Sequence, residues 1–333
     1  MLPKVLTTST TIFRQSQIPA GYRGTSDLKS CDRGTATVAQ VYLTADNDPE
    51  MRAANERARR TFRYFWRELS WERRRIIPGL DLACVKVPFE DPPELRSAEN
   101  NEGVEQMWLG DVDFDGRSVS GTLLNSPNWL KSISEGDEAK FPGKALSDWM
   151  YVINGRVYGA FTVQVLRAKM SAKERQQHDN AWGFDFGDPE SIHVVPPEWF
   201  TDKSDEQPPS SETAKGGFFG KLLGRSAKKP PSPVPPADPQ LVASMEHPMA
   251  ANMADSLTEY LQQNPEQVHT KDDRGWTMLH QQALAGTAIG VAILLKHGAD
   301  PNAVTANGVT AIQLAKSLGW KKVVDVLTKH GAT

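Results

Sequence analysis

Four residues in the middle of the chain have the spacing of a calcium-binding loop. Asp111, Asp113, Asp115 and Gly116 spell D-x-D-x-D-G, in which carboxylates would hold Ca²⁺. Such a loop needs a bidentate glutamate at its twelfth position, which is Thr122 here. The flanking residues alternate with period two, whereas a calcium loop joins two helices. We therefore predict a β-hairpin that turns at Asp115-Gly116, and no metal site.

Three other residues carry side chains that could act as an acid or a base. Asp148 is predicted to share a strand face with apolar residues, so it either caps a turn or serves a site next to Trp149. Glu105 and His193 are further candidates, since catalytic groups need only be close in space. No zinc-protease, nucleophile-elbow or Cys-His pattern is present. The sequence singles out no reaction and no cofactor.

A long helix is predicted from Pro49 onward. Asp48 is a residue type that caps helices, and apolar residues recur every three or four positions as far as Leu69. Nine arginines between Arg52 and Arg75 lie on the other face. We interpret this basic face as solvated, and a face that binds phosphate or acidic groups is the alternative.

Strand patterns follow the helix. The second predicted hairpin turns at Asn154-Gly155 and pairs Tyr151 with Tyr158, and we expect a final strand around His193. A helix followed by several antiparallel strands predicts an α+β fold, with a bent sheet or partial barrel.

The chain ends in a repeat array. Gly275 and Gly308, like Leu294 and Leu327, are 33 residues apart, which is the period of ankyrin repeats. With a degenerate first unit, about three repeats form an all-α solenoid. Four residues depart from the ankyrin pattern: Met278 and Ala311 stand where proline usually starts a helix, Gln282 replaces a small alanine, and Gln313 replaces a histidine.

The turn tips and inner-helix edge of this array are its predicted partner-binding surface. Trp276 matters most, since tryptophan is enriched among binding hot spots. Alternatively, Trp276 packs against the linker or the first domain. The predicted binding residues are Asp273, Arg274, Trp276, Leu284, Ala285, Ala306, Asn307, Val309, Ser317 and Leu318.

Composition predicts a soluble, cytoplasmic protein. The 333 residues carry a net charge of −3, which gives no electrostatic case for nucleic acid binding. Cys31 and Cys84 suggest no disulfide framework, and no signal peptide or transmembrane segment is apparent.

Four regions are predicted: an extension at 1–47 with a strand at 37–43, the α+β domain at 48–200, a proline-rich flexible linker at 201–240, and ankyrin repeats at 241–333. Phe218 to Arg225 mixes apolar and basic residues. It is interpreted as linker, with a membrane-surface or partner-docking helix as the alternative.

Three ordered motifs in the first domain carry a family resemblance: E-x-M-W, G-x-L-x-N-x-P and D-W-M-Y-x-x-x-G-x-x-x-G. With them, residues 48–167 resemble the YegJ-like bacterial domain of unknown function, number 2314 in its series. The resemblance implies a compact α+β domain and no established reaction. The family's characteristic positions would be Glu105, Trp108, Asn125, Pro127, Asp148, Trp149 and Gly159.

We therefore expect a non-enzymatic adaptor or antagonist, for instance a toxin-neutralising immunity protein, that grips a protein with its repeats. One alternative is an enzyme whose repeats recruit substrate. The other is a peripheral membrane adaptor that uses the linker.

Overall fold

A six-stranded antiparallel sheet forms the centre of the first domain. The computed structural model describes residues 48–96, 104–200 and 238–333. The strand order is β4-β3-β2-β1-β5-β6, so the sheet is open rather than a barrel. The strands are β1 (Leu82–Phe89), β2 (Glu105–Phe114), β3 (Ser118–Leu123), β4 (Glu138–Pro142), β5 (Asp148–Ile153) and β6 (Arg156–Gly159).

Both predicted hairpins are present. Asn154 and Gly155 have φ angles of 50° and 75°, as a type I′ turn requires, and Tyr151 pairs with Tyr158. In the β2–β3 hairpin the Asp115 amide donates to the Ser118 carbonyl at 3.2 Å. The two-residue loop is therefore Gly116-Arg117, one position later than predicted, because Gly116 takes the positive φ (89°) at the first loop position.

Helix α1 (Pro49–Glu72) packs its apolar face on this sheet. The Asp48 side chain accepts from the Glu50 amide and caps the helix, as predicted. Phe65 stacks at 5.5 Å on Phe62 and lies 6.0 Å from Trp149 of β5. These rings belong to the hydrophobic core between helix and sheet.

Two short helices follow the sheet: α2 (Phe161–Ala168) and α3 (Ala172–Trp182). The predicted final strand around His193 is wrong. The His193 carbonyl accepts one bond from the Gly159 amide, but Pro196 and Pro197 follow after two residues and cannot donate to a ladder.

The C-terminal region is a helical array, as predicted. A capping pair, α5 (Pro248–Asn252) and α6 (Ala254–Gln263), follows the short α4 (Pro239–Ser244). The two full repeats are α7 (Met278–Ala285) with α8 (Ala288–Lys296), and α9 (Ala311–Ser317) with α10 (Lys321–Lys329). Thr277 and His280 form the predicted bonds between turn and helix, and His280 Nε2 lies 3.0 Å from the Ala303 carbonyl.

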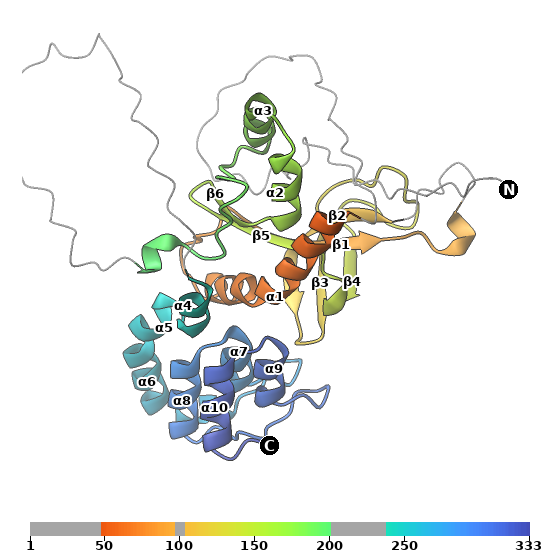
Figure 1. Ribbon diagram of the computed structural model, residues 1–333. Helices are drawn as coiled ribbons and strands as arrows, with labels where there is room; N and C mark the ends of the chain where they lie inside the picture. The colour runs from red at the N-terminus through yellow and green to blue at the C-terminus, as the bar shows by residue number, and fades with distance from the viewer. Residues whose placement is uncertain (1–47, 97–103, 201–237) are drawn as a thin grey trace, which may run out of the picture.

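The ankyrin array packs against the first domain. Figure 1 shows α1 between the sheet and the blue ankyrin helices, so α1 is covered on two sides. The predicted strand at 37–43 and the segment from Phe218 to Arg225 lie outside the described residues. Within the described ranges, no helix is long and apolar enough to span a membrane.

Candidate functional site

The inner face of the ankyrin array is buried against the first domain. Trp276, Leu284, Val309 and Leu314 belong to the same hydrophobic cluster as Phe114 of β2. Trp276 is 6 % exposed and Leu284 is 1 % exposed. Their apolar surface is therefore used within the chain. We call this cluster the domain interface.

The hairpin approaches α9 closely at the domain interface. A Cβ atom added at Gly116 would lie 2.5 Å from Leu314 Cδ2, and the φ angle of 89° also favours glycine there. The β2–β3 turn therefore inserts against the second full repeat.

The expectation that Trp276 is exposed is wrong, and the alternative, packing on the first domain, is what the structure has. Three more predicted binding residues are buried (Leu284, Ala285 and Val309), and Leu318 is half-buried. The exposed ones are Asp273, Arg274, Ala306, Asn307 and Ser317. Spacing predicted a partner-binding face on the repeats, but it did not show that the first domain of this chain covers part of that face.

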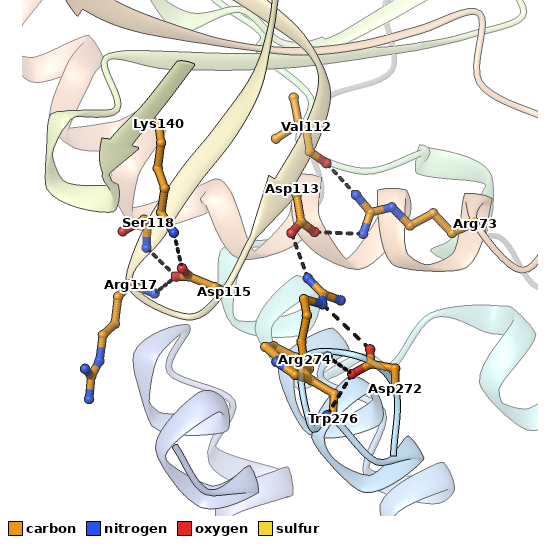
Figure 2. Close-up of polar contacts among 10 residues, drawn as sticks. All are labelled: Arg73, Val112, Asp113, Asp115, Arg117, Ser118, Lys140, Asp272, Arg274 and Trp276. Carbon is orange, nitrogen blue, oxygen red and sulfur yellow. Dashed lines mark hydrogen bonds and ion pairs between the residues drawn. The ribbon is translucent and has the colours of Figure 1, made fainter. Parts of the chain in front are cut away.

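Asp113 bridges two arginines at the rim of the domain interface (Figure 2). Its carboxylate lies 3.1 Å from Arg73 at the end of α1 and 2.8 Å from Arg274 in the array. Arg73 also donates to the Val112 carbonyl at 2.6 Å. The side chains of this triad are 34–49 % exposed. Such pairs add little stability, so they orient the domains more than they hold them.

The remaining aspartates of the D-x-D-x-D-G segment serve the hairpin. Asp115 accepts from the amides of Arg117 and Ser118 and pairs with Lys140 at 2.9 Å. Asp111 has a φ angle of 47° at a bulge in β2. No group of three potential metal ligands occurs among the residues that the structure describes.

Of the nine arginines between Arg52 and Arg75, six are exposed, as a solvated face predicts, two are half-buried, and Arg67 is buried. Arg67 is 1 % exposed and donates to the Met245 carbonyl at 2.8 Å. Its guanidinium lies over the rings of Tyr64, Trp199 and Trp320, at 5.3, 5.3 and 5.8 Å. Burial lowers the pKa of Arg67. Aromatic rings from distant segments thus replace water around this cation.

A buried ion network extends this contact. Glu68, 1 % exposed, accepts from Arg75 at 2.9 Å and lies 3.1 Å from His247 Nε2. His247 Nδ1 accepts from the Met249 amide and so caps α5. This bond leaves Nδ1 unprotonated, and burial lowers the pKa of His247, although Glu68 opposes the shift. Glu68 and His247 join α1 to the start of the array.

The Asp148 side chain caps the N-terminus of α2, although Asp148 lies 13 positions before Phe161 in the sequence. Its carboxylate is fully buried and accepts from the amides of Phe161 (3.0 Å) and Thr162 (2.7 Å), and from the Thr162 hydroxyl (2.6 Å). It also accepts from the Trp149 amide at 2.8 Å. Ala160, which precedes the helix, has no side-chain cap. Asp148 therefore supplies the acceptor that Ala160 lacks.

Lys86 is the countercharge of Asp148. It is 2 % exposed, and its ammonium donates to the Thr162 hydroxyl at 3.0 Å and lies 5.4 Å from the Trp108 ring centre. Burial lowers the pKa of Lys86 to about 8, opposed by the nearby Asp148. Burial likewise raises the pKa of Asp148, opposed by Lys86. The sequence analysis missed Lys86, although an isolated lysine in an apolar strand was a signal for it.

The other acid–base candidates serve different parts of the domain. Glu105, whose pKa is raised by burial, accepts from the Asn128 amide and side chain. It thus fixes the loop that carries Asn125 and Pro127. The His193 carbonyl accepts a hydrogen bond from the amide of Gly159, the last residue of β6. Asp148 and Glu105 therefore bind separate sets of donors.

Two further residues to which the family resemblance pointed support the core. Trp149 Nε1 donates to the Ala58 carbonyl of α1 at 2.9 Å. Gly159 has a φ of 81°, and a Cβ there would lie 2.5 Å from the Trp149 carbonyl oxygen. These positions fit a structural role.

Two family models match the two domains of this architecture. The family model described as an uncharacterized protein conserved in bacteria (DUF2314) matches residues 48–186, and the model for ankyrin repeats in three copies matches residues 247–333. YegJ of Escherichia coli K12, an uncharacterized protein, is 27 % identical over 97 residues, which are 29 % of this chain and 58 % of that protein. The ankyrin domain of human ASB11 covers 26 % of this chain and 41 % of its own, at 28 % identity and a TM-score of 0.22.

A protein of Neisseria meningitidis serogroup B that is described as a putative ankyrin repeat protein matches across both domains. It is 39 % identical over 287 residues, which are 86 % of this chain and 96 % of that protein. The YegJ-like resemblance of the first domain is thereby confirmed, and the repeats support a role in protein interaction. The chain belongs to a family of bacterial ankyrin-repeat proteins with an N-terminal DUF2314 domain.

Proposed function

We propose that the chain is a non-enzymatic protein-binding adaptor or antagonist whose two domains act as one binding unit. A toxin-neutralising immunity protein is one form of such an antagonist. Ankyrin repeats are interaction modules, and in this chain their inner face packs against the first domain. We therefore assign the partner surface to the exposed residues of the array that lie beside the domain interface.

That surface is a ridge of turn tips: Asp273, Arg274, Ala306 and Asn307. The Ala306 amide donates to the Arg274 carbonyl at 2.9 Å, so the tips of the two full repeats are contiguous. All four residues are exposed. The observation that carries the proposal is the pair of Arg274 with Asp113 at 2.8 Å, since it extends this turn ridge onto the first domain. A partner on the turn ridge would touch both domains.

The enzymatic alternative has less support. A carboxylate offers about four lone-pair sites, and four donors already bind that of Asp148. A group bound in this way positions a helix and has little capacity left for a substrate. The membrane alternative depends on Phe218 to Arg225, outside the described residues.

Affinity capture with the full-length protein tests the proposal. The variant Asp273→Arg/Asn307→Arg changes the turn ridge, and Lys329→Glu is the control on an exposed position of α10. We expect wild type and control to retain the same host protein in near-equal molar amounts, and the ridge variant to lose it. Equal retention by the ridge variant would refute the proposed surface, and no stoichiometric protein partner of wild type would refute the function.

A further inference from the structure

An apolar cavity of ≈ 380 Å³ lies where α1, the capping helices and the first full repeat meet. This volume is in the range of small-molecule sites. Its apolar lining includes Trp71, Met253, Leu257, Tyr260, Met278 and Ile293. Met253 and Tyr260 are 44 % and 45 % exposed, so the cavity opens to the surface. It is separate from the turn ridge.

Arg74 is the only charged side chain among the described residues that line the cavity. Its neighbours Arg73 and Arg75 pair with carboxylates, namely Asp113 and Glu72. No carboxylate in the described ranges forms an ion pair with Arg74. Its guanidinium lies 5.0 Å from the Trp71 ring centre. Arg74 as a whole is exposed, but partial desolvation by its neighbours lowers its pKa to about 10, so the side chain stays charged at neutral pH.

Two departures from the ankyrin pattern also line this cavity. Met278 stands where proline usually starts the helix, and Gln282 stands where a small alanine is usual. Gln282 Oε1 accepts a long bond of 3.3 Å from Arg74 Nη1. Across from it, a Cβ on Gly290 would lie 2.9 Å from Gln282 Oε1, so glycine leaves room for the amide. Met278 thus adds a flexible side chain to the apolar wall, and Gln282 supplies a polar partner for Arg74.

We propose that this cavity binds a small carboxylate with an apolar body, such as a medium-chain fatty acid. The apolar chain would lie along the methionine and aromatic walls, and Arg74 would bind the carboxylate through its planar fork. A peptide strand fits less well, because its backbone would need several hydrogen-bond partners in a mostly apolar lining. The ligand would touch α1 and the array together.

Methyl NMR of the full-length protein with labelled methionines tests the site, with decanoate and decan-1-ol as probes below their aggregation concentrations. We expect saturable shifts of the Met253 and Met278 methyl signals. Decanoate should bind about tenfold or more tightly than the alcohol, as a charge-assisted bond predicts. No saturable shift, or equal affinity for the two probes, would overturn the proposal.

Two variants test the role of Arg74. Arg74→Gln should reduce decanoate affinity to that of the alcohol. Gln282→Glu keeps the shape of the cavity and gives Arg74 an internal carboxylate, so it should have the same effect even if Arg74→Gln folds poorly. Arg60→Gln, at an exposed position of α1, is the matched control and should bind as wild type. Unchanged decanoate affinity in Gln282→Glu would contradict the assignment, as would shifts that depend on protein concentration, because a second copy would then fill the cavity.

Discussion

Replacing Trp276 by alanine should destabilise the protein far more than replacing its neighbour Arg274. Trp276 is 6 % exposed and belongs to a hydrophobic cluster with residues from both domains. Loss of its side chain therefore leaves a cavity at the domain interface. Truncation of a buried tryptophan costs about 3–5 kcal/mol. Arg274 is 49 % exposed, and its pair with Asp113 contributes about 0.2–1 kcal/mol. Its contact with the Trp276 ring at 5.0 Å adds about 0.5–1 kcal/mol.

Urea unfolding of the full-length protein, followed by circular dichroism, measures both costs. We expect Trp276→Ala to lower the free energy of unfolding by about 3–5 kcal/mol, and Arg274→Ala by at most about 2 kcal/mol. Ala306→Ser, at an exposed tip, serves as the control and should change little. If Arg274→Ala cost as much as Trp276→Ala, the ion pairs rather than the apolar contacts would hold the domains together, and the reasoning would be refuted.

Two further predictions concern buried ionisable groups. Asp148→Ala should lower the free energy of unfolding by about 3–5 kcal/mol, because it leaves the Lys86 charge buried without its countercharge; a stable variant in urea unfolding would count against the capping role. The folded-state pKa of His247 is lowered below its usual value of about 6.5, so the unfolded chain binds more protons and stability should fall as pH drops through and below that value. Urea midpoints between pH 8 and 5 should fall less steeply in His247→Asn, which keeps a capping side chain; an identical slope would mean that His247 does not titrate as described.

Features set by local interactions could be predicted from the sequence. The Asp48 cap, the Asn154-Gly155 turn and the 33-residue period each depend on residues close together in the chain, so each was predicted at its place. The predicted position of the β2–β3 turn differs from the observed one by one residue. Both Asp115 and Gly116 suit a turn, and the positive φ of Gly116 sets the position. Local chemistry was sufficient for these elements.

The association of the two domains could not be predicted in this way. Glu68 and His247 are 179 positions apart, and neither indicates the other in the sequence. Arg67 is the buried exception on an otherwise largely exposed arginine-rich face, and its aromatic partners Trp199 and Trp320 come from distant segments. Likewise, Trp276 has the chemistry of a partner-binding residue whether its partner is another protein or the same chain.

The contact between Gly116 and Leu314 tests most directly whether the ankyrin array holds the first domain. The hairpin places the Gly116 α-protons against a Leu314 methyl group, since a Cβ there would lie 2.5 Å from Leu314 Cδ2. In the full-length protein in solution, we predict a nuclear Overhauser effect between these protons. Its absence, in spectra that contain the expected effects within each domain, would contradict the account.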